Sequence, residues 1–455
     1  MKRIIPKSDQ TPLDLLIVGG GIHGAAMAYY ASQNKLRVAL VEKDDFCSHT
    51  SANSQKVIHG GLRYLQSFDI KRVLESIRER QRFYALFPHL VRPLPCVLPL
   101  SGWGTRSREA MGIAFILYRF LQKLVCRNGF NAHLDKQPHL LSVSKMKEMF
   151  PSLDMNKSRG GAYWYDGLCV EPERVVISLL KSAASKNASV ANYAKLINIT
   201  RIDDSTLSVV VRDRLTGKDH TFKTRKIALC TGPWLKDDFD LQQIPNELEQ
   251  LRLISGLNIV TKKLTDSSAS IALKNKSATQ SGLLFVLPWK NYSISGTLWN
   301  DGGKTPQFLE DVATTAQQLN SDVYDCYPVS HKAPPVLSHH FGYVPGSNDN
   351  SKSPSDRILS HYLLVDREQQ KSGDVLQVVG VKFTTAFDVA HKALVKLFPQ
   401  HSITNRLSSD TLPVGSPSNA TEEYVESLFK SMRQKYLQQI SHYYSPLLEQ
   451  SLLTL

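Results

Sequence analysis

The sequence lacks the marks of several protein classes. Its six cysteines form no C-x-x-C pair and no zinc spacing, so scattered reduced thiols and a reducing compartment are favoured. The first twelve residues are polar and contain no apolar core, so no secretory signal is expected. No run reaches about 18 uninterrupted apolar residues, so no transmembrane helix is expected either.

Acidic residues are also scarce relative to basic ones, and the net charge is +14. The lysines and arginines are dispersed and form no tract interleaved with aromatic residues, so nucleic acid is a poor partner. The charge suits an anionic substrate or an anionic membrane surface. We expect a cytoplasmic protein, free or peripheral on the inner face of a membrane. The 455 residues leave room for two or three domains.

One strongly apolar segment, residues 110–125, has basic residues at 106, 108, 119, 123 and 127. Two interpretations remain open. The segment is a core helix of the fold, or it lies in a membrane interface with its cationic flank towards lipid phosphate.

A strand–turn–helix–strand pattern opens the chain. The apolar run Leu15–Val18 leads into a G-x-G-x-x-G turn at Gly19, Gly21 and Gly24, a helix-like run follows, and the strand Val38–Val41 ends in Glu42. This order is that of a dinucleotide-binding βαβ unit, in which the helix N-terminus faces the pyrophosphate. Glu42 is placed to accept hydrogen bonds from the adenosine ribose.

A second segment is expected to bind the other half of a larger ligand. Residues 50–56 form a hydroxyl-rich loop, and His59, Gly60, Gly61, Arg63 and Tyr64 follow it. The two glycines bring the backbone close to a flat or anionic group. An NAD site does not need this second segment, whereas a longer cofactor does.

These motifs carry a family resemblance. The run Lys56–Arg63, supported by Thr231-Gly232-Pro233-Trp234, resembles the FAD-dependent glycerol-3-phosphate dehydrogenase/oxidase family, within the flavin oxidoreductases that include the amino-acid oxidases. The resemblance implies FAD as the cofactor and an α/β fold. An FAD-binding Rossmann-type (two-dinucleotide-binding) domain would combine with an antiparallel β-sheet substrate domain and a reduced C-terminal helical extension. The expected FAD-binding parts are 1–105, 166–240 and 351–405, with a cap segment at 106–165, the substrate domain at 241–350 and the helical region at 406–455.

The resemblance also implies site roles. His59, Arg63 and Lys382 would be catalytic, and Arg63, Tyr64 and Lys382 would bind an anionic substrate. A hydride would pass from a polar secondary alcohol to flavin N5, and the electrons would pass to a quinone-type acceptor. No metal is expected. The expected cofactor-binding residues are Gly19, Gly20, Gly21, Ile22, Gly24, Glu42, Lys43, Thr50, Ser51, Ser54, Lys56, His59, Gly60, Gly61, Thr231, Gly232, Gly380, Lys382 and Thr384.

Several positions depart from the family pattern. Asn258 stands where the family usually has a proton-accepting His, and Val344 where it has a phosphate-clamping Arg. Leu298-Trp299 replaces a Thr-Asp pair, and Val381 replaces a Gly. Two alternatives therefore stay open: an amine or amino-acid oxidase that returns electrons to oxygen, and a flavin-binding protein whose catalytic groups have decayed.

Local patterns complete the prediction. Asp69–Phe87 reads as a helix with Asp69 as its N-cap and with Glu79 on the polar face. The prolines at 88, 93, 95 and 99 are expected to break the next segment into short extended pieces. Strands are expected at 257–261, 283–288, 292–297 and 375–379.

Overall fold

The computed structural model describes residues 1–7, 11–104, 106–126, 136–156, 158–234, 245–275, 282–303, 312–329, 332–367 and 374–405. The chain divides into two compact units, Met1–Leu412 and Pro413–Leu455. All described residues belong to the first unit. The expected C-terminal helical region, 406–455, lies outside the described residues.

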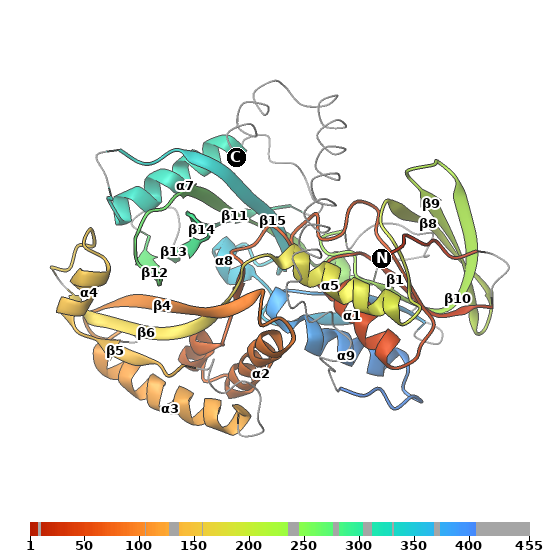
Figure 1. The fold of residues 1–455 in the computed structure, drawn as a ribbon, viewed down its shortest axis with the longest axis horizontal. Helices are drawn as coiled ribbons and strands as arrows, with labels where there is room; N and C mark the ends of the chain where they lie inside the picture. Colours follow the sequence, from red (N-terminus) through yellow and green to blue (C-terminus); the bar gives the residue numbers. More distant parts are fainter. Residues whose placement is uncertain are drawn as a thin grey trace. The chain divides into compact units, whose positions relative to one another are not determined.

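The first sheet is built from segments far apart in the sequence (Figure 1). Its parallel centre consists of β7 (Ser189–Ala191), β2 (Val38–Val41), β1 (Leu13–Val18), β10 (Asp219–Leu229) and β17 (Val375–Val379). The antiparallel strand β16 (Leu363–Asp366) closes one side, and β8 (Ala194–Asp203) and β9 (Thr206–Asp213) extend from β10.

Both faces of this sheet are covered, as a parallel sheet requires. Leu15 and Ile17 of β1 share a core with three helices, α1 (Ile22–Gln33), α5 (Pro172–Ser185) and α9 (Ala386–Leu397). Leu16 and Val18, which point to the other face, share a core with β8 and β9. The continuous apolar run of β1 follows from this burial on two sides.

The second sheet has the order β15-β11-β14-β13-β12-β4-β6-β3. Its neighbours are antiparallel except where β12 meets β4. The strands are β3 (Val57–Ile58), β4 (Val91–Ser101), β6 (Ser158–Cys169), β11 (Arg252–Lys262), β12 (Ser270–Lys274), β13 (Leu283–Trp289), β14 (Tyr292–Asp301) and β15 (Val336–Gly346), with β5 (His139–Leu141) paired to β6. The predicted α/β class is therefore confirmed.

The remaining helices are α2 (Ile70–Leu86), α3 (Arg108–Cys126), α4 (Val143–Met149), α6 (Asn246–Glu249), α7 (Val312–Cys326) and α8 (Pro354–Arg357). The 3-10 turns are η1 (Leu62–Ser67) and η3 (Phe383–Thr385). Among the described residues, no helix is long and apolar enough to cross a membrane.

Helix α2 has the predicted cap, because the Asp69 side chain accepts a hydrogen bond from the Arg72 N–H. The prediction for Glu79 was wrong, since its side chain is buried. Its carboxylate accepts hydrogen bonds from the Arg82 guanidinium and from the Asp388 N–H of α9. A second helix packed on the nominally polar face explains the difference.

The proline-rich segment also differs from its prediction, because β4 is one strand of eleven residues rather than several pieces. Its prolines, Pro93, Pro95 and Pro99, share the same parity along the strand. Backbone N–H groups alternate between the two edges of a strand, so the missing donors fall along one edge. The other edge remains free to pair with β6 over its length.

Candidate functional site

The glycine turn after β1 lies at the carboxyl edge of the parallel strands β1, β10 and β17. Gly21 precedes α1 and has no side chain with which to cap the helix, so the positive end of the helix dipole faces the glycine turn, where an anion can bind. Gly19 has φ +114°, and a Cβ on it would lie 2.3 Å from the Cys230 carbonyl oxygen. A Cβ on Gly24 would lie 1.9 Å from the Gly19 carbonyl oxygen. The backbone is therefore drawn tightly together, which fits a pyrophosphate cradle.

Replacing Gly24 with Ala tests this packing. The new methyl meets backbone atoms that cannot rotate away, so we expect a loss of about 1–3 kcal/mol of stability or more. Thermal unfolding of the purified protein measures it. The matched control is Gly112→Ala in α3, where the nearest atom would be 3.7 Å away and Ala favours the helix. Equal melting temperatures for the two variants would contradict the tight approach.

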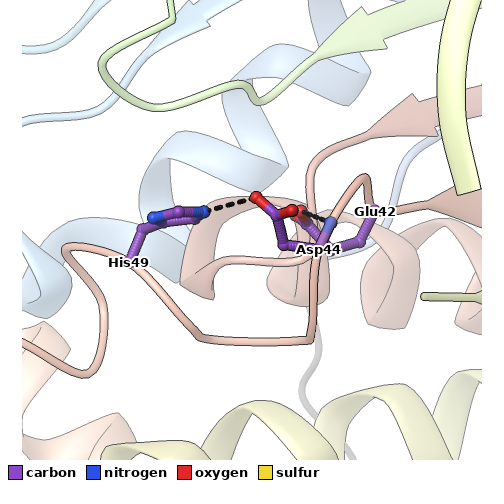
Figure 2. A group of neighbouring side chains, drawn as sticks. All are labelled: Glu42, Asp44 and His49. Atoms are coloured by element: carbon purple, nitrogen blue, oxygen red, sulfur yellow. Dashed lines mark hydrogen bonds and ion pairs between the residues drawn. The ribbon is translucent and has the colours of Figure 1, made fainter. Parts of the chain in front are cut away.

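Glu42 closes β2 beside the glycine turn (Figure 2). One carboxylate oxygen accepts the Gly20 N–H at 2.6 Å, and the other accepts the Asp44 N–H at 2.8 Å. Burial raises the pKa of Glu42 despite these two donors. Its carboxylate holds the turn in shape, and each oxygen keeps a second lone pair with which to accept a ligand hydroxyl. Its role at the ribose stays a prediction.

Beside Glu42, His49 Nε2 forms a hydrogen bond with an Asp44 carboxylate oxygen (Figure 2), and the two atoms are 2.8 Å apart. This hydrogen bond lowers the pKa of Asp44 to about 2. The ligand atoms of Glu42, Asp44 and His49 lie within 4.8 Å of one another. Backbone donors occupy Glu42, and the Arg214 guanidinium bonds to Asp44, so hydrogen bonds within the chain explain the cluster.

Two aromatic rings, those of His49 and Trp234, pack together beside the Glu42 cluster. The Trp234 ring stands edge-on to His49 with the centroids 4.4 Å apart, and Lys43 Nζ lies 3.7 Å from the Trp234 centroid. Trp234 follows Thr231 and Gly232 at the end of β10. The Thr231 hydroxyl donates to the Trp234 carbonyl and accepts from the Gln377 amide of β17.

The hydroxyl-rich loop joins the two sheets. Ser51 Oγ accepts the Ile22 N–H of α1 at 3.0 Å, and Thr50 Oγ1 exchanges hydrogen bonds with the Tyr343 backbone of β15. Ser54 Oγ accepts the Lys56 N–H. Lys56 is buried, its Nζ donates to the Ala52 carbonyl and it lies 3.7 Å from a Glu173 oxygen. The hydrogen bond from its ammonium to the Ala52 carbonyl therefore stabilises the loop.

A buried carboxylate, Asp166 of β6, fixes the turn at Gly60. Its oxygens accept the Gly60 N–H at 2.6 Å and the Trp164 indole N–H at 3.3 Å. Burial alone would raise the pKa of Asp166, but His59, the Arg80 charge and the Gly60 donor together lower it. Tyr118 of α3 donates to the Gly60 carbonyl at 2.7 Å. Both polar atoms of the Gly60 backbone are therefore held.

His59 precedes this turn with its side chain more than half exposed. Its Nδ1 lies 3.6 Å from an Asp166 oxygen, and its backbone N–H donates to Thr384 Oγ1 at 3.2 Å. Thr384 belongs to η3, directly after Lys382. The structure thus brings together the His59 turn and the Gly380–Thr384 segment, which are separated by more than 300 residues.

The three predicted substrate-binding residues are also neighbours. Lys382 Nζ lies 4.4 Å from the centroid of the Tyr64 ring, and the Arg72 guanidinium lies 4.6 Å from the same centroid. Burial, reinforced by the Arg63 charge, lowers the pKa of Lys382 to about 8. A cation destabilised in this way gains from an anionic partner.

Three of the departures from the family pattern, at Asn258, Leu298-Trp299 and Val344, lie on β11, β14 and β15, whereas Val381 follows β17. Asn258 is buried, and its Oδ1 accepts the Thr297 hydroxyl at 2.8 Å. Val344 pairs with Ile254 across β11 and β15 and brings no charge. Neither residue supplies a titratable group.

Asp166 and Arg80 were not anticipated from the sequence. Arg80 has no exposed side-chain surface, and it donates to the Tyr165 carbonyl at 2.5 Å. A Cβ on Gly60 would lie 2.0 Å from an Arg80 nitrogen. The available signals were an acid at the end of an aromatic strand pattern and a cation near the apolar stripe of α2, and neither signal is specific.

Comparisons with known proteins agree on one family. The model of the family "FAD dependent oxidoreductase" matches residues 14–364. A glycerol-3-phosphate dehydrogenase of Synechocystis is 27% identical over 419 residues, which cover 87% of this chain and 72% of that protein. The mitochondrial glycerol-3-phosphate dehydrogenase of Macaca fascicularis is 28% identical over 422 residues, and the chain spans only 55% of its length.

Solved structures share the fold at low identity. The glycerol-3-phosphate dehydrogenase from Bacillus halodurans, solved with FAD, aligns with a TM-score of 0.65 at 18% identity, over 94% of this chain and 73% of that one. A glycine oxidase from Geobacillus kaustophilus aligns with a TM-score of 0.60 at 15% identity, over 88% and 100%.

Proposed function

The chain belongs to the family of FAD-dependent oxidoreductases, and on this premise we propose that it oxidises a small phosphorylated secondary alcohol of the glycerol 3-phosphate type. The membership agrees with the resemblance predicted from the sequence motifs. The observation that carries the substrate proposal is the grouping of Lys382, Tyr64 and Arg63 beside the His59 turn. The names of the Synechocystis and macaque relatives support the same substrate.

The residues present fit FAD. The glycine cradle at Gly19–Gly24 and the open N-terminus of α1 suit the pyrophosphate. Glu42 would accept hydrogen bonds from the ribose, and the loop from Thr50 to Gly61 and the Gly380–Thr384 segment would hold the remainder. When bound, FAD supplies the two-electron oxidation of the substrate carbon, and the protein supplies binding and orientation.

Residues of the chain would hold the substrate phosphate and accept the substrate proton. Arg63 and Lys382 would hold the substrate phosphate, with the Tyr64 hydroxyl as a further donor. His59 Nδ1 faces the Asp166 carboxylate, which leaves Nε2 to accept the proton of the substrate hydroxyl. Because Asn258 cannot titrate, His59 is the better proton acceptor in this chain.

Anaerobic mixing with glycerol 3-phosphate tests the proposal. Loss of the oxidised-flavin absorbance of the purified holoprotein would support it, and glycerol or inorganic phosphate alone should leave the spectrum unchanged. If glycerol 3-phosphate fails while dithionite reduces the flavin, the substrate proposal is wrong.

The replacements at Asn258 and Val344 favour a second candidate, an amine or amino-acid oxidase that uses oxygen. Without an arginine at 344, one phosphate contact is missing, which lowers affinity by about ten- to a hundredfold. Reduction by a small amine with release of peroxide would favour this candidate. A flavin that no alcohol or amine reduces would indicate decayed catalytic groups.

We further propose that electrons leave to a quinone-type acceptor at a membrane surface. Helix α3 is apolar on both sides. Met111, Phe115 and Tyr118 are buried. The opposite stripe is exposed, with exposed fractions of 70%, 69%, 58% and 51% for Ile113, Ile116, Phe120 and Leu124. An exposed apolar stripe near basic residues suits the headgroup region of an anionic bilayer.

Negative charges placed on this stripe should weaken membrane binding. We expect Ile116→Glu combined with Phe120→Glu to lower co-sedimentation with vesicles of anionic lipid by about tenfold or more. Ile202→Glu is the matched control, because Ile202 is also half exposed but lies on β8. If the double variant sediments like the wild type, α3 is not the membrane contact.

A further inference from the structure

The glycine turn contains a histidine that takes no part in holding the substrate or accepting its proton. His23 lies in the first turn of α1, between Ile22 and Gly24. Its ring packs against Gly380, at the end of β17. A Cβ at Gly380 would lie 2.2 Å from His23 Cε1 and 2.5 Å from each ring nitrogen. Glycine at 380 is therefore required by the imidazole itself.

The position of His23 connects two parts of the candidate site. On one side, the neighbouring Ile22 N–H bonds to Ser51 of the hydroxyl-rich loop. On the other side, Gly380 opens the segment that carries Lys382 and Thr384. The imidazole is thus held where the helix N-terminus meets the turn that follows β17.

The ring nitrogen Nε2 is buried and has no hydrogen-bond partner among the residues that the structure describes. Burial lowers the pKa of His23 to about 4, so the ring is neutral near pH 7, with one nitrogen a donor and the other an acceptor. Buried polar groups in native proteins nearly always have a partner. A nitrogen left without one inside the candidate cofactor site indicates a ligand atom.

We propose that His23 anchors the cofactor, by a hydrogen bond from its Nε2 to an oxygen of bound FAD. The inference rests on the proposed cofactor site but not on the substrate. The two oxygen-rich parts of FAD, its pyrophosphate and its ribityl chain, offer the same chemistry to a neutral imidazole. The buried nitrogen destabilises the protein without FAD, and binding of the cofactor satisfies it.

His23 should therefore stabilise the FAD complex and destabilise the apoprotein. Replacement by Phe, which keeps a ring and removes both nitrogens, should weaken FAD binding by about tenfold or more. The same replacement removes the unpartnered nitrogen, so the apoprotein should melt at the same temperature or higher. His23→Asn keeps a donor and an acceptor and should retain more of the affinity than His23→Phe.

The experiment titrates each apoprotein with FAD, followed by flavin fluorescence, and records thermal unfolding without cofactor. His391→Phe is the control, because His391 also lies beside an aromatic ring, that of Tyr30, and has its own partner, the Ile403 carbonyl. The control should leave the FAD dissociation constant unchanged. No substrate is needed, so failure of the glycerol 3-phosphate proposal would leave the result interpretable.

Two outcomes would overturn the proposal. If His23→Phe binds FAD as tightly as the wild type, the nitrogen does not contact the cofactor, whatever the melting temperature. If the His23→Phe apoprotein melts well below the wild type and His23→Asn loses as much FAD affinity as His23→Phe, the ring serves only to pack against Gly380. Wild-type protein that fails to bind FAD would refute the cofactor site itself.

Discussion

Replacing Asp166 with Ala should destabilise the protein by about 3–5 kcal/mol, the usual effect of breaking a buried charge pair. The Gly60 N–H and the Trp164 indole N–H lose their acceptor. Arg80, which has no exposed side-chain surface, loses the carboxylate 3.9 Å away. The Gly60 turn then loses the backbone anchor that sets its conformation. We expect weak FAD binding even in the fraction that folds.

Urea unfolding of the apoprotein measures the stability change, and fluorescence titration measures FAD affinity. Asp166→Asn keeps an acceptor for Gly60 and should cost only about 1–3 kcal/mol. The critical result is the order of stability: Asp166→Ala should be the least stable, Asp166→Asn intermediate and the wild type the most stable. If the two variants are equally stable, the charge and the hydrogen bond of Asp166 do not hold the turn, and the account of the His59–Gly60 geometry is wrong.

Replacing Lys382 with Met should weaken binding of glycerol 3-phosphate by about ten- to a hundredfold at pH 7, because a charge-assisted bond to phosphate is lost. FAD should still bind. The concentration of substrate that half-reduces the flavin gives the affinity. Lys392→Met is the matched control, since Lys392 is a lysine of α9 paired with Asp388. An equal loss in both variants would point to a general charge effect.

The same lysine predicts a pH dependence. Its pKa is lowered to about 8, so the free protein loses this charge as the pH rises through 8. Only the ammonium form attracts a phosphate. Wild-type affinity should therefore fall about tenfold per pH unit above pH 8, while Lys382→Met should show no such fall. A wild-type affinity that stays level to pH 10 would remove Lys382 from the phosphate site.

The beginning of the fold was predictable because its signals are local. The apolar run Leu15–Val18, the glycine spacing and the acid at 42 all lie within about thirty residues, as the βαβ unit requires. The helix over 70–86 was likewise predictable from its apolar periodicity and its Asp69 cap. The contact of Lys382 with Tyr64 came from family resemblance, since no local rule joins residues that distant.

Residues whose roles depend on distant partners could not be predicted. Glu79 looks like an ordinary solvent-facing helix charge until α9 covers it, and Arg80 is only a cation near the apolar stripe until it bonds to β6. Asp166 gains its role only because β6 lies beside β3. His23 looks like any residue in the variable part of a glycine motif. Its significance depends on Gly380, which the sequence places more than 350 residues away.

The order of the parallel strands has a consequence for how the chain must mature. The cofactor edge needs β1, β10 and β17, and β17 begins only at Val375. During synthesis the glycine turn leaves the ribosome before β10 and β17 are made, and its exposed apolar strand surface favours aggregation. A nascent chain stopped before residue 375 would lack one wall of the site. Truncated products of this kind should depend on chaperones, and only a polypeptide that includes β17 should take up FAD.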